Sequence, residues 1–199
     1  MLKKMLHSSF VLAVTCGICM FCVSLIYKVT FDDIEYKNNQ KKQAALSIIL
    51  GDLEIEPIAQ TFSQDDTTYE IYLGRDQKTK EIQGWGVLTS IQGYSSLIQT
   101  LIGIDKDYNI IAMEILLQQE TPGLGAECVS TGPKKLSSLW SQDKPVKKRP
   151  WFQDQFTGQN LESMDFKIIT GATITSTAIR QSVAKGIEIV KNYRNCIKK

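Results

Sequence analysis

Apolar residues along the chain form one long block near the N-terminus, several short blocks further on, and a helical repeat near the end. The long block, residues 8–27, has no charged side chain over 20 positions. A helix rises about 1.5 Å per residue, so this block covers roughly the 30 Å of a bilayer core. The pattern therefore predicts a transmembrane helix.

The charges on either side of this block predict its orientation. Lys3 and Lys4 precede it, and Asp32, Asp33 and Glu35 follow it. Because basic residues favour the cytoplasmic side, we expect the N-terminus inside and the rest of the chain outside the bacterial cytoplasmic membrane. A cleaved signal peptide is the alternative, but the block exceeds a usual signal core and no small-residue cleavage site follows it. We expect a retained, single-pass anchor.

Three cysteines, Cys16, Cys19 and Cys22, share one face of this predicted helix. Thiolates at such spacing could bind a metal ion or an iron–sulfur cluster. Small apolar side chains also let membrane helices pack closely, and we favour this packing role. Further along, Cys128 and Cys196 are candidates for a disulfide, a pairing that the sequence leaves open.

Short apolar blocks and turn residues predict the elements beyond the anchor. Residues 34–50 become weakly periodic before Gly51, which predicts a stalk helix ending at that glycine. Residues 51–68 contain Pro57 and a polar run, which favour a linker. Alternating or apolar runs predict strands at residues 69–73, 82–91, 97–104, 110–117 and 166–169.

Two more helices are predicted, and together the elements indicate an α+β fold. Residues 134–139 favour a short helix, and a longer amphipathic helix follows from apolar residues spaced three or four apart: Ile179, Val183, Ile187 and Val190. Strands mixed with a few helices predict an α+β domain. We divide the chain into an anchor at residues 1–28, a stalk helix and linker at 29–68, and a folded domain at 69–199.

Composition excludes several classes of protein. A formal charge of +2 gives no sign of affinity for nucleic acid, and 43% hydrophobic residues are enough for a core. The sole histidine, His7, lies at the membrane edge, so the domain has no histidine triad and no histidine-rich metal site. The basic residues within 144–149 are interpreted as a solvated surface. We assign no catalytic residue and no metal ligand.

The densest group of hydroxyl side chains directly precedes the amphipathic helix, in Thr170-Gly171-Ala172-Thr173-Ile174-Thr175-Ser176. Ser and Thr oxygens accept the free N–H groups of a first helical turn. The same N–H groups and the helix dipole attract anions, phosphate above all. The motif therefore predicts either an ordinary cap, with Ser176 as the capping residue, or a phosphate site surrounded by hydroxyls.

A second motif, Glu120-Thr121-Pro122-Gly123-Leu124-Gly125, follows the predicted strand at residues 110–117. Proline fixes one backbone angle, and the glycines permit conformations closed to other residues. A tight loop at a strand end is either a simple turn or a surface that contacts a ligand.

Together the two motifs resemble the hallmarks of covalent FMN-binding domains. The first resembles the Ser/Thr-Gly-Ala-Thr signature of that family, and the second matches its Glu-Thr-Pro-Gly-Leu-Gly loop. Shorter matches extend the resemblance over about residues 80–194: Gly93-Tyr94-Ser95, Trp151, Phe152 and Phe156-Thr157-Gly158. The family includes the G subunit of the Rnf electron-transport complex and the C subunit of the sodium-pumping NADH:quinone oxidoreductase.

The resemblance implies roles for nine residues of an FMN-binding domain at residues 69–199. Thr173 carries FMN through a phosphoester bond made by a flavin transferase. The phosphate turn is shaped or lined by Thr170, Gly171, Ala172 and Thr175. The flavin ring lies along Glu120, Thr121, Gly123 and Leu124.

The resemblance also implies a function. It indicates a membrane-anchored flavoprotein that relays electrons within an ion-translocating ferredoxin:NAD oxidoreductase, as one subunit among other membrane subunits and not as an enzyme alone. The short chain favours the Rnf G subunit over the quinone-reductase C subunit. Two alternatives are an anchored sensory or binding module for a phosphorylated ligand and a structural subunit without flavin. Lys167 stands where the family usually has Asp, and Gln118 and Gln119 stand where many relatives have His.

Overall fold

The computed structural model describes residues 2–64, 67–131 and 149–197, and the chain divides into two compact units, Met1–Lys41 and Lys42–Lys199. The helix predicted at residues 134–139 lies outside the described residues, as does the basic loop up to residue 148. The side chain of Cys196 is also outside them, so its pairing with Cys128 stays a prediction.

One helix, α1 (Leu2–Leu50), contains both the predicted anchor and the predicted stalk. Among the described residues it is the one helix long and apolar enough to span a membrane, with a mean hydropathy of 2.4 over a window that is not buried at all. It ends at Gly51, which has a φ of +63° and donates its N–H to the carbonyl of Ser47 at 3.1 Å. The candidate span and the glycine at the end of the stalk are thereby confirmed.

Five antiparallel strands follow in chain order and form one sheet: β1 (Glu54–Gln64), β2 (Thr67–Arg75), β3 (Ile82–Gln92), β4 (Leu97–Asp105) and β5 (Ile110–Leu117). The strands predicted between residues 69 and 117 are confirmed as β2 to β5. The linker predicted at residues 51–68 is wrong, because most of that segment forms β1 and pairs with β2. Pro57 is tolerated there because β1 lies at the edge of the sheet, where an N–H can be spared.

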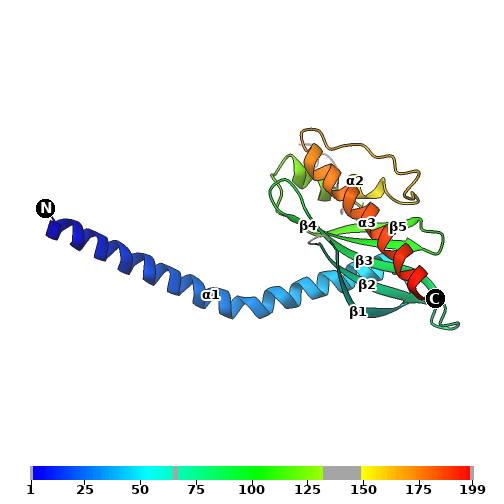
Figure 1. Cartoon of the computed structure of the whole chain (residues 1–199), viewed down its shortest axis with the longest axis horizontal. Helices are drawn as coiled ribbons and strands as arrows, with labels where there is room; N and C mark the ends of the chain where they lie inside the picture. Colours follow the sequence, from blue (N-terminus) through cyan, green and yellow to red (C-terminus); the bar gives the residue numbers. More distant parts are fainter. Residues whose placement is uncertain (1, 65–66, 132–148, 198–199) are drawn as a thin grey trace, which may run out of the picture. The chain divides into compact units, whose positions relative to one another are not determined.

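The two faces of the sheet are covered by different helical segments. Helix α3 (Thr173–Ile197) lies across one face (Figure 1), and its apolar stripe packs into a core with Val87 and Ile102. The last residues of α1, within the unit Lys42–Lys199, cover the other face, with Leu46 and Ile49 packed against Leu101. This arrangement of a sheet between helices confirms the predicted α+β fold class.

Glycines let the helices approach the sheet closely. A methyl group at Gly103 of β4 would lie only 2.0 Å from Cγ2 of Ile49 in α1. A methyl group at Gly186 of α3 would lie 2.8 Å from Cδ1 of Ile102. Both distances are too short for two carbon atoms. On each face of the sheet, the helix can therefore pack this closely only because a glycine has no side chain.

In the sequence between β5 and α3, the chain forms two short helices, η1 (Gly125–Val129) and α2 (Trp151–Asp154). The strand predicted at residues 166–169 is wrong. The backbone there pairs with a glutamine side chain instead of a strand: Lys167 donates its N–H to Oε1 of Gln155 at 2.8 Å and accepts from Nε2 at 3.3 Å. Phe166 packs against the buried Phe156, with ring centroids 5.7 Å apart.

Candidate functional site

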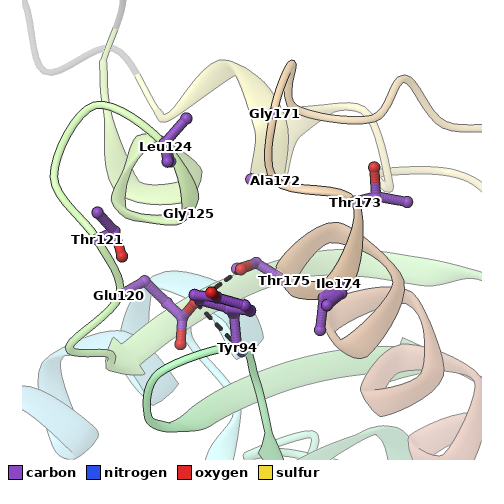
Figure 2. Close-up of a pocket in the computed structure, with 10 residues that line it drawn as sticks. All are labelled: Tyr94, Glu120, Thr121, Leu124, Gly125, Gly171, Ala172, Thr173, Ile174 and Thr175. Atoms are coloured by element: carbon purple, nitrogen blue, oxygen red, sulfur yellow. Dashed lines mark hydrogen bonds between the residues drawn. The ribbon is translucent and has the colours of Figure 1, made fainter.

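A cavity of about 350 Å³ opens between the two sequence motifs (Figure 2). One wall is the loop that follows β5, and the other is the turn that begins α3. Its volume is within the range of small-molecule sites in proteins. The lining residues are Tyr94, Glu120, Thr121, Leu124, Gly125, Gly171, Ala172, Thr173, Ile174 and Thr175.

The carboxylate of Glu120 joins three segments at the base of this cavity. Its Oε2 accepts the hydroxyl of Thr175 at 2.7 Å and the N–H of Tyr94 at 3.3 Å. Its Oε1 accepts the N–H groups of Ser95 and Ser96, each at 3.0 Å, and the hydroxyl of Ser96 at 3.1 Å. Glu120 itself is only 5% exposed. A buried carboxylate is stable in this position because donors surround it.

These donors decide the charge of Glu120. Burial on its own would raise the pKa of the carboxyl group. The hydrogen bonds from Thr175, Ser95 and Ser96 outweigh that effect and hold the pKa of Glu120 below its ordinary value of 4.5. The site therefore contains a fixed negative charge at neutral pH.

Two glycines allow the loop and the turn to come together. A methyl group at Gly125 would lie 2.7 Å from Oγ1 of Thr175 and 2.9 Å from Oε2 of Glu120. Gly171 has a φ of +77°, and a methyl group there would lie 2.9 Å from Cδ2 of Leu124. The glycine of each motif is thus needed where the other motif approaches.

Thr173 is the first residue of α3, and its side chain is exposed beside the cavity. The first helical hydrogen bond runs from the N–H of Ser176 to the carbonyl of Ala172 at 3.0 Å. The N–H groups of Thr173 and the next two residues come before any helical acceptor. With the positive end of the helix dipole, such groups favour an anion at the first turn, next to Thr173.

Ser176 does not cap the helix, so the capping prediction is wrong. Its hydroxyl accepts the N–H of Ile169 at 3.0 Å and donates to the carbonyl of Ala172 at 2.9 Å. Ser176 is fully buried and holds the segment before the helix against the first turn. The first-turn N–H groups are therefore not taken up by its oxygen.

The structure brings most of the predicted site residues together. Seven of the nine line the cavity, while Thr170 and Gly123 do not. Three further residues, Tyr94, Gly125 and Ile174, line it as well. Each of these three residues lies inside a sequence motif that was already identified. Their membership of those motifs could have marked them as lining residues. The role of the lining residues in binding stays a prediction.

Gln118 and Gln119 both hold the loop, Gln118 through its side chain and Gln119 through its backbone. Oε1 of Gln118 accepts the N–H of Glu120 at 2.7 Å, and the N–H of Gln119 donates to Oγ of Ser96 at 2.8 Å. The second of these bonds joins the end of β5 to the β3–β4 connection. The departures from the family pattern thus leave the arrangement around Glu120 intact.

Cys128 of η1 lies beneath the site and is fully buried. Burial, together with the nearby charge of Glu120, raises the pKa of its thiol to about 12. The thiol is therefore protonated at neutral pH and unsuited to act as a nucleophile or metal ligand. Within the described ranges, no three His, Cys, Asp or Glu side chains gather in a way that could hold a metal ion.

Comparison with known proteins confirms the resemblance read from the motifs. Residues 93–188 match the model of the FMN-binding domain family, and both motifs lie inside that match. The chain is 28% identical to the G subunit of the Na(+)-translocating ferredoxin:NAD(+) oxidoreductase complex of Acetobacterium woodii, covering 96% of this chain and 93% of that protein. It is 25% identical to the G subunit of the proton-translocating ferredoxin:NAD(+) oxidoreductase complex of Clostridium ljungdahlii, covering 92% and 89%.

A third relative is the G subunit of the ion-translocating oxidoreductase complex of Buchnera aphidicola, which is 27% identical over 95% of this chain and 89% of that protein. The matches with these relatives cover nearly the whole chain, so they include its N-terminal segment as well as residues 93–188. The similarity therefore extends beyond the FMN-binding domain itself.

Proposed function

We propose that this chain is the FMN-bearing G subunit of an ion-translocating ferredoxin:NAD oxidoreductase, anchored by α1 and carrying FMN covalently on Thr173. The observation that carries the proposal is the position of Thr173. Its exposed hydroxyl stands at the first turn of α3, beside a cavity bounded by both motifs of the matched domain. When bound, FMN supplies one- and two-electron redox chemistry.

The residues of the chain hold and orient the cofactor. The Thr173 oxygen would hold the phosphate as an ester, and the N–H groups of the first turn of α3 would compensate its remaining charge. Gly171 and Ala172 would let the backbone come close to the phosphate, and the exposed Thr170 directly before them would line that turn. Thr121 and Leu124, which line the cavity, would hold the flavin ring and shield one side of it from water, and Gly123, with a φ of +77°, would let the loop between them turn along the ring.

The apolar part of α1 anchors the protein in the bacterial cytoplasmic membrane, with the N-terminus inside and the FMN domain on the extracytoplasmic side. A covalent bond keeps the flavin from diffusing away on that side. The electron donors and acceptors are the neighbouring membrane subunits. Cys16, Cys19 and Cys22, which are exposed on α1, provide a face for packing against a helix of such a subunit.

The test is flavin fluorescence in a denaturing gel. The full chain is co-expressed with a flavin transferase, alongside Thr173→Ala and the control Thr177→Ala, which removes a hydroxyl four residues further along the same helix. We expect fluorescent bands for the wild type and for Thr177→Ala and a dark band for Thr173→Ala. A dark wild-type band, with the transferase active on another substrate, would overturn the proposal in favour of a binding or structural role.

A further inference from the structure

Tyr94 is the single aromatic residue among the ten that line the cavity. It lies in the connection between β3 and β4, and its side chain is 67% exposed. Figure 2 shows its ring beside Glu120 and Thr175, and both Tyr94 and Thr173 line the cavity. A large exposed aromatic ring at the edge of a cavity is a typical contact for a flat, apolar ring system.

The backbone of this connection is held mainly by Glu120. Three successive N–H groups, those of Tyr94, Ser95 and Ser96, donate to its carboxylate. Gly93 permits the approach, since a methyl group there would lie 2.7 Å from Oε1 of Glu120. The backbone from which the Tyr94 ring projects is therefore positioned largely by this carboxylate.

The same carboxylate also binds the helix that begins at Thr173. The Thr175 hydroxyl donates to Oε2 at 2.7 Å, two residues after the attachment site. Counting Tyr94, Ser95, both donors of Ser96 and Thr175, five hydrogen bonds reach Glu120. A carboxylate offers about four lone-pair directions, so its acceptor capacity is already used by the protein.

We propose that Glu120 is a positioning residue, which fixes the Tyr94 ring relative to the start of α3 so that the ring stacks on the isoalloxazine of the flavin attached at Thr173. This inference rests on the proposed function. It replaces the expected direct contact between Glu120 and the flavin with an indirect one through Tyr94. An isoalloxazine is flat and electron-poor, and a tyrosine ring is electron-rich, so the two stack favourably.

Flavin fluorescence in the folded, flavin-loaded protein reports this stacking, because a flavin stacked on tyrosine is quenched. An aromatic pair contributes about 0.5–1.5 kcal/mol, so the stacked arrangement is about 2- to 12-fold more populated than the separated one. Only the separated flavin fluoresces strongly. Tyr94→Leu should therefore raise the fluorescence per bound flavin about threefold or more. The matched control is Tyr36→Leu, which changes a similarly exposed tyrosine of α1 and should leave the fluorescence unchanged.

Glu120→Gln tests the positioning role, because an amide NH₂ would face N–H donors where an oxygen now accepts them. It should reproduce the rise seen with Tyr94→Leu, and it should add nothing when combined with Tyr94→Leu. If Glu120→Gln does not fold, Thr175→Val and Ser96→Ala each remove one donor to Glu120, Ser96→Ala also removing the acceptor of the Gln119 N–H, and both should give smaller rises in the same direction.

The outcomes separate this inference from the proposed function. A wild-type protein with no covalent flavin refutes the function on which the inference rests. If the protein carries covalent flavin but Tyr94→Leu does not change its fluorescence, the stacking is refuted. If Tyr94→Leu raises the fluorescence but Glu120→Gln, Thr175→Val and Ser96→Ala leave it unchanged, Glu120 does not position the ring. That result refutes the positioning role and leaves Glu120 a structural residue.

Discussion

Replacing Thr175 with valine tests whether the Glu120 carboxylate holds the site together. The two side chains have similar volumes, so the change removes a hydrogen-bond donor while keeping the packing. Thr175 is 1% exposed and Glu120 is 5% exposed, so solvent can replace little of the lost bond. A hydrogen bond to a charged group contributes about 1.5–3 kcal/mol, and we expect the free energy of unfolding to fall by about that amount at pH 7.

The pH dependence follows from the lowered pKa of Glu120. A carboxyl group whose pKa is lower in the folded protein stabilises it fully above the ordinary pKa of 4.5, and that contribution is lost as the pH falls through the folded value. Thr175→Val removes one cause of the lowering, so the pKa of Glu120 in the mutant moves back toward 4.5. The difference in stability between the two proteins should therefore be largest near neutral pH and shrink below pH 4.5.

The assay is urea unfolding of the full chain in detergent between pH 3.5 and pH 7, followed by tryptophan fluorescence, to which the buried Trp85 contributes. The matched control is Thr177→Val, the same chemical change at a half-buried position two residues further along α3, for which we expect a change within about 0.5 kcal/mol. Equal losses in Thr175→Val and Thr177→Val, or a loss that does not change with pH, would refute the reasoning.

Three further results are expected. Gly125→Ala should destabilise the domain by about 1–3 kcal/mol in urea unfolding and impair flavin loading, because its methyl group meets Oγ1 of Thr175 at 2.7 Å; normal loading and stability would contradict this. Gly103→Ala should shift the urea midpoint downward through overlap with Ile49, without altering the fluorescence of flavin that is loaded. Cys128 should resist alkylation in the folded protein at pH 8, measured by peptide mass spectrometry, since burial raises the pKa of its thiol to about 12.

Local patterns were sufficient for the elements whose residues interact within one segment or with the next. The apolar block of α1, its end at Gly51 and the repeat of α3 follow from contacts along a single helix. The strands β2 to β5 are each neighbours in sequence and in the sheet, so their alternation and turns predicted them.

Elements whose structure depends on a partner could not be found in the same way. Residues 54–64 have no clear alternation, and they are extended because β2 offers them hydrogen bonds at the edge of the sheet. Residues 166–169 are apolar enough for a strand, yet the side chain of Gln155, 12 residues earlier, takes the place of a neighbouring strand at Lys167. Gln155 lies outside a local window around Lys167, whereas β2 begins only three residues after β1 ends, so β1 was missed because residues 54–64 lack alternation.

For the site, the sequence determined which residues are involved, since its two motifs supply most of the cavity lining and the proposed attachment residue Thr173. The tertiary structure decided what Glu120 does there. Its charge is buried, so it must gather donors, and it finds them 24 residues away at Ser96 and 55 residues away at Thr175. That requirement brings the Tyr94 ring to the cavity, and it becomes visible only when the three segments have folded together.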